Sequence, residues 1–123
     1  MIKTRGLYHL HLVVRDLDRS LRFYREVFGL EEQFRDGPKM VFLSTPGGHD
    51  LITLNEDPSF AERAGVEGGI DHFGFALAPD ADFEAAVAEI CRAGGTLVRR
   101  SPPGGPGRQY AYVRDPDGYL IEL

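Results

Sequence analysis

The sequence lacks several features that would assign it to particular classes of protein. It has one cysteine and no tryptophan in 123 residues, so no disulfide can form within the chain, and a reducing, cytoplasmic compartment is expected. No apolar run approaches the roughly 18 residues of a membrane span, and we expect no signal peptide. Basic residues form no long cluster and the net charge is −5, which argues against nucleic acid or an anionic membrane as partner.

The remaining composition is that of an ordinary globular protein. Apolar residues make up 42% of the chain and charged residues 27%, and a chain of this length can bury a core of its own. We therefore expect a single domain over residues 1–123 that acts on a small molecule. The lone Cys91 falls in a predicted helix, where it is expected as a small buried side chain.

Hydrophobic periodicity predicts the same order of elements twice. Residues 7–15 alternate as a strand, Asp16 or Asp18 is expected to cap a helix that ends near Phe28, and strands follow at 30–34, 40–44 and 51–55. The second half repeats this order. A strand is predicted at 70–78, a helix capped by Asp80 or Asp82 follows, and strands come at 96–100, 109–114 and 119–123.

This repeat predicts an α+β fold built from two βαβββ modules. The first module covers residues 5–55 and the second covers 70–123, with a linker at 56–69 that contains a helical turn around 59–64. We expect the modules to pair into a curved, cup-like mixed sheet with the helices outside. Alternate strand positions would then line the concave face.

A charged residue interrupts the last strand. Leu120 and Glu122 share one face of that strand, opposite Tyr119, Ile121 and Leu123. A carboxylate on a half-buried strand is costly unless it is paired, protonated or bound to a cation. His9 and His72 stand at matching positions of the first strand of each module, which makes them the candidate partners of Glu122.

Five segments carry a family resemblance. They are His9–Leu17 (HLHLVVRDL), Phe23–Tyr24, Phe28–Leu30, Asp71–Phe75 (DHFGF) and Asp115–Leu123 (DPDGYLIEL). With these segments the chain resembles the vicinal oxygen chelate superfamily. That group includes glyoxalase I, extradiol dioxygenases, fosfomycin resistance enzymes, methylmalonyl-CoA epimerases and bleomycin resistance proteins.

The resemblance implies a metal site. Ligands in this family come from the first and last strand of each half, which correspond here to His9, Thr53, His72 and Glu122. Two imidazoles and a carboxylate suit a divalent first-row metal, with Fe(II) or Mn(II) favoured and Zn(II), Ni(II) or Co(II) possible. A neutral hydroxyl is a poor ligand, so Thr53 is expected to contact substrate instead. The remaining three-ligand pattern looks like extradiol and fosfomycin enzymes more than four-ligand lyases.

His11 is the rival of His9 for the metal. It lies on the same face, roughly 7 Å further along the strand. Spacing to Asp16 favours His9, and His11 is then an acid–base group, a substrate contact or a hydrogen-bonded wall residue. A further histidine, His49, is expected in a turn and in contact with solvent.

Tyr112 is the second catalytic candidate, and its orientation depends on the final hairpin. If residues 116–118 form a three-residue loop, Tyr112 pairs with Glu122. Tyr110 then shares their face, where it is expected to contact substrate. A two-residue loop would turn Tyr112 away. Facing the pocket, its phenol could donate a hydrogen bond to a metal-bound substrate oxygen or to Glu122. The alternative is a tyrosine that packs on the sheet.

The Pro/Gly-rich loop 101–108 has two interpretations. It could fold over the mouth of the pocket, with Arg108 binding an anionic substrate. The favoured interpretation is a mobile surface loop.

Three functions follow from the resemblance. The first is an extradiol-type dioxygenase, an oxidoreductase acting on a small catechol-like or enediol substrate. The second is non-redox catalysis by a metal-dependent lyase, isomerase, epimerase or thiol transferase. The third is drug binding without catalysis, as in bleomycin resistance proteins. We expect a homodimer, because open strand edges need cover, with the metal site either within one chain or shared between two.

Overall fold

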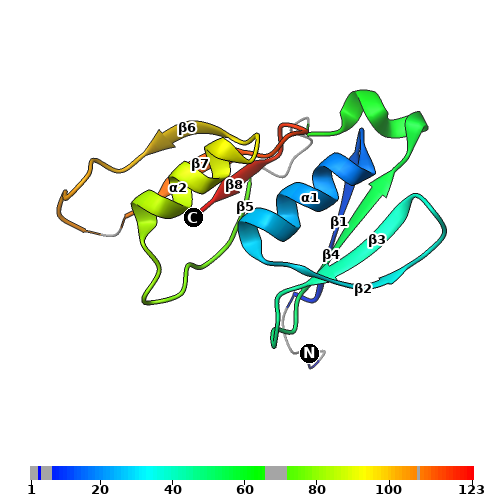
Figure 1. Cartoon of the computed structure of the whole chain (residues 1–123), viewed down its shortest axis with the longest axis horizontal. Coiled ribbons are helices and arrows are strands. Elements are labelled where there is room, and N and C mark those ends of the chain that lie inside the picture. Colours follow the sequence, from blue (N-terminus) through cyan, green and yellow to red (C-terminus); the bar gives the residue numbers. More distant parts are fainter. Residues whose placement is uncertain (1–2, 4–6, 66–71, 108) are drawn as a thin grey trace. The chain divides into compact units, whose positions relative to one another are not determined.

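The computed structural model describes residues 3, 7–65, 72–107 and 109–123. The chain divides into two compact units, Met1–Arg63 and Ala64–Leu123. The first unit runs from blue to green in Figure 1, and the second continues to red. Each unit has a four-stranded mixed sheet and an α-helix in the order βαβββ. The predicted α+β class and the repeated module are therefore confirmed.

The first unit begins with β1 and ends in a short 3₁₀ helix. Its sheet has the order β1-β4-β3-β2, with β1 parallel to β4 and the other pairs antiparallel. The 3₁₀ helix falls in the segment where a helical turn was predicted. The elements are β1 (His9–Val14), α1 (Leu17–Phe28), β2 (Glu31–Arg35), β3 (Met40–Ser44), β4 (Leu51–Glu56) and η1 (Pro58–Arg63).

Helix α1 begins and ends where local side-chain chemistry predicts. Asp16, rather than Asp18, is the N-cap, and its carboxylate accepts a hydrogen bond from the Arg19 N–H at 2.9 Å. Gly29 ends the helix in the left-handed conformation, with φ of 64°. The buried stripe of the helix packs towards β4 and consists of Leu17, Leu21, Phe23 and Tyr24.

Alternation along the strands divides the first sheet into two faces. The side chains turned towards α1 form the core of the unit, and they are Leu12, Val14, Val41, Leu43, Ile52 and Leu54. His11 and Phe42 are both register partners of Thr53. These three residues, with His9, therefore lie on the opposite face, which we call the helix-free face.

Glu56 joins the end of β4 to the start of α1. Its carboxylate forms an ion pair with Lys39 and accepts a hydrogen bond from the Leu17 N–H at 2.8 Å. The contact with Lys39, and then the bond from Leu17, lowers the pKa of Glu56. The folded state thus favours the ionised carboxylate. This stabilisation is present above the unfolded-state pKa and is lost as pH falls through the folded-state pKa.

Glu56→Gln should therefore destabilise the protein in a pH-dependent way. We expect the free energy of unfolding to fall by about 1 kcal/mol near neutral pH, because a charge-assisted hydrogen bond at the helix start is weakened. Urea denaturation at about pH 7 and about pH 3 should show the difference from wild type shrink as the carboxylate protonates. Glu26→Gln, at an exposed position of α1, is the matched control. A loss that is the same at both pH values would contradict this role.

The second unit repeats the topology of the first. Its sheet has the order β5-β8-β7-β6, with β5 parallel to β8. The elements are β5 (Phe73–Gly74), α2 (Phe83–Arg92), β6 (Thr96–Arg100), β7 (Ala111–Arg114) and β8 (Leu120–Glu122).

Two predictions for this unit were wrong in part. The strand predicted at 70–78 is limited to β5, with 70–71 outside the described residues and 75–78 not in a strand. Its partner β8 has three residues, and pairing stops after the Phe75 N–H donates to the Glu122 carbonyl. Cys91 lies in α2 as predicted but is exposed. The buried face of α2 is Phe83, Val87 and Ile90, and the next residue is rotated out of that face.

A buried aspartate closes the final hairpin. The side chain of Asp115 is 4% exposed, and its Oδ1 accepts hydrogen bonds from the N–H groups of Asp117, Gly118 and Tyr119 at 2.9, 2.8 and 2.9 Å. Gly118 has a positive φ of 101°, which glycine adopts without strain. The resulting three-residue loop pairs Tyr112 with Glu122, so the predicted register is confirmed.

Candidate metal-binding site

Two of the predicted metal ligands meet in the second unit. Glu122 lies in β8 between β5 and β7, and His72 directly precedes β5. The Nε2 atom of His72 is 3.0 Å from Oε2 of Glu122, and both side chains are a little over one quarter exposed. Gly74 is the register partner of Glu122, and a Cβ at position 74 would lie 3.1 Å from the Glu122 carbonyl oxygen. A glycine therefore lets the two strands approach closely beside the pair.

The separation of this pair suits metal coordination. Imidazole nitrogen and carboxylate oxygen both bind first-row ions at about 2.1 Å, so donors 3.0 Å apart can occupy neighbouring positions of one ion at an angle of about 90°. Without an ion, the same contact is a histidine–carboxylate hydrogen bond. Within either unit, the described residues contain no group of three or more His, Cys, Asp or Glu side chains able to hold an ion.

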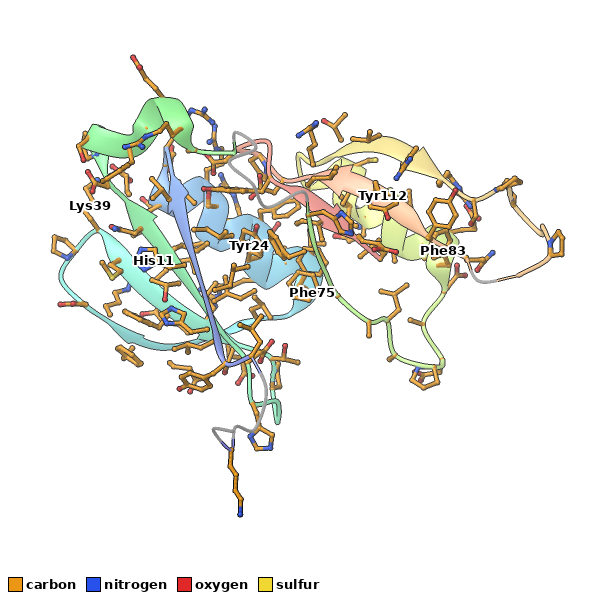
Figure 2. All side chains as sticks on the ribbon, turned by 180° about the vertical axis from the view of Figure 1, so that it is seen from behind. His11, Tyr24, Lys39, Phe75, Phe83 and Tyr112 are labelled. Carbon is orange, nitrogen blue, oxygen red and sulfur yellow. The ribbon has the colours of Figure 1, made fainter. Side chains whose placement is uncertain are left out.

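Tyr112 stands beside the His72–Glu122 pair, on the face that the hairpin register predicted. Its ring meets the His72 ring edge-on, with centroids 5.0 Å apart and an interplanar angle of 88°. Tyr112 projects from β7 (Figure 2), and the Tyr110 ring lies 5.9 Å from it. Two tyrosine rings and an imidazole thus form an aromatic wall next to the candidate ligands.

Arg99 completes this wall, and the sequence did not identify it. Its guanidinium carbon lies 4.3 Å from the centroid of the Tyr112 ring, and no carboxylate among the described residues forms an ion pair with it. A bulge between Leu97 and Arg99 shifts the register of β6. Simple alternation along the strand could not have placed Arg99 on the face of Tyr112, because the bulge changes which residues share a face.

In the first unit, His9 is bonded to the residue at the fourth ligand position. Its Nε2 lies 2.5 Å from Oγ1 of Thr53, whose side chain is fully buried. The hydroxyl of Thr53 is thus a hydrogen-bond partner of the His9 ring, which was predicted to bind metal. The His11 ring stacks beside that of His9 with centroids 6.1 Å apart. Partial burial, and then the charge of His9, lowers the pKa of His11.

The other predicted contacts are less completely defined. Tyr110 precedes β7, and its N–H and carbonyl both bond to Ser101, at Oγ and N–H respectively. This closes the Pro/Gly-rich loop at its base. Arg108, predicted to bind an anionic group, lies outside the described residues.

No described helix is both long enough and apolar enough to cross a membrane.

Known proteins resemble this chain in sequence over nearly all of its length. The family model of the Glyoxalase/Bleomycin resistance protein/Dioxygenase superfamily matches residues 6–123. Lactoylglutathione lyase GLX1 of Arabidopsis thaliana is 34% identical, over 93% of this chain and 42% of its own length. A manganese-dependent 2,3-dihydroxybiphenyl 1,2-dioxygenase of Geobacillus genomosp. 3 is 32% identical, over 94% of this chain and 35% of its own length. The chain therefore spans less than half the length of these two relatives.

A solved structure matches over nearly the whole of both chains. It is a mutant of the fosfomycin resistance protein FosX of Listeria monocytogenes, in complex with Mn(II) and 1S,2S-dihydroxypropylphosphonic acid. The match has a TM-score of 0.76 at 25% identity and covers 98% of this chain and 90% of that chain.

Proposed function

This chain belongs to the Glyoxalase/Bleomycin resistance protein/Dioxygenase superfamily, and from that premise we propose that it is a divalent-metal-dependent dioxygenase acting on catechol-like diols. The observation that carries this proposal is the His72–Glu122 pair, 3.0 Å apart, with Tyr112 against the His72 ring. Superfamily membership supports a metalloenzyme. The finer assignment depends on the ligand set and the aromatic wall.

We propose His9 as the third ligand beside His72 and Glu122. Thr53 offers only a hydroxyl at the fourth position, which leaves coordination sites for substrate. One relative is manganese-dependent by name and the FosX complex contains Mn(II), which favours Mn(II) or the chemically similar Fe(II). The ion, when bound, would hold two neighbouring substrate oxygens and stabilise negative charge on them.

The names of these relatives support the proposed substrate class. 2,3-Dihydroxybiphenyl and 1S,2S-dihydroxypropylphosphonic acid both carry hydroxyls on neighbouring carbons. In this chain, Tyr110, Tyr112 and His72 present ring edges and faces next to the candidate ligands. Such a wall suits a flat aromatic diol, because aromatic rings gain from edge-to-face and stacked contacts.

We assign a separate chemical role to each side chain near the candidate ligands. The Tyr112 hydroxyl donates a hydrogen bond to a substrate oxygen that gains negative charge, and Arg99 above its ring holds that ring in place. His11, beside His9, takes the proton from a substrate hydroxyl. Each diol consumes one molecule of O₂ with cleavage of one ring C–C bond, and both oxygen atoms enter the product.

The likeness to FosX supports a second candidate, the non-redox opening of an epoxide. Both reactions need only three protein ligands and open metal positions. The lyase alternative is disfavoured by Thr53, because a neutral hydroxyl is a weak substitute for a carboxylate ligand. Drug binding without catalysis leaves the retention of His9, His72 and Glu122 unexplained.

Tyr112→Phe tests the proposed chemistry. Protein purified without oxygen should bind Mn(II) or Fe(II) and consume oxygen with catechols, and the variant should keep its metal while the rate falls about 100-fold, as expected for loss of a proton donor. Oxygen uptake and metal analysis of the same samples measure both effects. Tyr110→Phe, which keeps the neighbouring ring, should retain the rate.

Metal-loaded protein that opens an epoxide and consumes no oxygen with any catechol would favour the second candidate. Protein that binds no divalent metal would exclude both candidates.

A further inference from the structure

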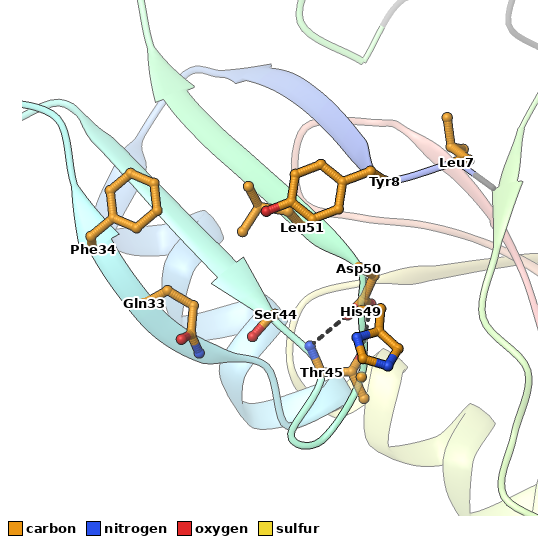
Figure 3. Close-up of a pocket in the computed structure, with 10 residues that line it drawn as sticks. Leu7, Tyr8, Gln33, Phe34, Ser44, Thr45, His49, Asp50 and Leu51 are labelled. Carbon is orange, nitrogen blue, oxygen red and sulfur yellow. Dashed lines mark hydrogen bonds between the residues drawn. The ribbon is translucent and has the colours of Figure 1, made fainter. Parts of the chain in front are cut away.

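The first unit contains a cavity of about 1000 Å³ that none of the proposed site residues lines. Its wall includes Tyr8 before β1, Phe34 on β2 and Leu51 on β4 (Figure 3). The turn between β3 and β4 supplies His49 and Asp50. The described lining residues all belong to the first unit.

A row of aromatic rings links this cavity to His9. The Phe34 ring stacks on the Phe42 ring, with centroids 4.2 Å apart and an interplanar angle of 16°. The Phe42 centroid is in turn 5.9 Å from that of His9, and Leu51 of the cavity wall is the register partner of His9. The cavity is therefore continuous with the helix-free face that carries the proposed ligand.

The described lining combines large aromatic surfaces with polar side chains. Tyr8 and Phe34 are 63% and 53% exposed, so large aromatic surfaces are available. Asp50 supplies the carboxylate of the described lining, and its two oxygens bind the N–H and the hydroxyl of Thr45 at 2.9 and 2.7 Å. None of the described lining residues is Lys or Arg. Among the described lining residues, an anionic group would meet the Asp50 carboxylate, with the His49 imidazole as the basic side chain.

We propose that this cavity is the subsite for the non-reacting part of the substrate, a neutral aryl or bulky alkyl substituent. The inference rests on the proposed function for the other end of the molecule, whose vicinal oxygens would lie towards His9. Phe34 is then a specificity-determining residue that presents a flat face to the substituent. By the same chemistry, a glutathionyl group, which carries two carboxylates, does not suit this cavity.

The test compares probes that differ in one substituent. Isothermal titration of the metal-loaded protein without oxygen should give at least about tenfold tighter binding of 4-phenylcatechol than of catechol, because a phenyl group is buried. 4-Carboxycatechol should show no such gain. Phe34→Ala should abolish the gain for 4-phenylcatechol and leave catechol unchanged. Phe34 lies half-exposed on an edge strand, so its truncation leaves the core intact.

Two control variants and one further probe separate the subsite from the reaction. Phe34→Tyr should keep the gain, and so should Val98→Ala, which removes an exposed apolar side chain from the other sheet. 2-Naphthol has no neighbouring hydroxyls, and it should bind the wild-type protein and lose affinity in Phe34→Ala and Tyr8→Ala, whether or not catechols react.

The binding and oxygen-uptake results distinguish failure of the subsite from failure of the dioxygenase. Binding of 2-naphthol that depends on Phe34, without oxygen uptake with any catechol, would retain the subsite and reject the dioxygenase. Equal affinity for catechol and 4-phenylcatechol, with no effect of Phe34→Ala, would overturn the subsite even if catechols react.

Discussion

Glu122→Gln is expected to lower affinity for a divalent metal by more than about 100-fold, because it removes a proposed ligand rather than an outer hydrogen-bond partner. The change keeps the shape of the side chain and removes its charge. The neutral amide is a weaker donor to a divalent ion, and His72, 3.0 Å away, loses its anionic neighbour. Metal analysis after dialysis and titration with Mn(II) measure the effect, and oxygen uptake should fall in parallel.

A surface carboxylate of α2 provides the control for Glu122→Gln. Glu89→Gln removes a carboxylate from α2, where it pairs with Arg92 at the surface, and should leave metal affinity unchanged. Unaltered metal affinity in Glu122→Gln would mean that the carboxylate stabilises the strand and does not bind an ion.

The chain that supplies His9 can be identified by mixing variants. His9→Ala and Glu122→Gln proteins are unfolded and refolded together. If a symmetric dimer shares its sites, mixed pairs contain one intact site and regain metal and activity. If each site is built within one chain, the mixed pairs regain neither metal nor activity.

Asp115→Ala is expected to cause the largest loss of stability, about 4 kcal/mol in the free energy of unfolding. The carboxylate is buried and satisfies three backbone N–H groups of one turn. Alanine removes this acceptor from the N–H groups of Asp117 and Tyr119, whereas the Gly118 N–H keeps its bond to the Asp115 carbonyl at 3.0 Å. Urea denaturation, with the slope checked against wild type, measures the change.

Asp115→Asn separates the hydrogen bonds from the charge. The asparagine retains an oxygen acceptor at the Oδ1 position but not the negative charge, so about half of the loss is expected. Asp36→Ala, in an exposed turn, should cost less than about 0.5 kcal/mol. Near-wild-type stability of Asp115→Ala would refute the assigned role. Because this turn sets the register of Tyr112 against Glu122, Asp115→Ala should also weaken metal binding.

The sequence by itself determined the elements whose causes are local. Each helix start was predicted to within two residues, and Asp16 and Asp82 cap the helices through their own side chains. The loop that ends at Gly118 sets the register of the hairpin, which placed Tyr112 opposite Glu122. The repeated order of strands and helices was also legible, because alternation and helical spacing depend on neighbouring residues.

Only the tertiary structure decided how closely side chains from remote segments approach one another and which residues a bulge turns onto a face. The approach of His72 to Glu122 joins residues 50 positions apart. The bulge in β6 set the face of Arg99, and the length of β8 limited β5 to two residues. The cavity beside Phe34 is lined by residues from β2, β4 and the turn before β4, which are remote in the chain. These features depend on distances between segments remote in the chain, whereas periodicity specifies only the face on which a residue lies.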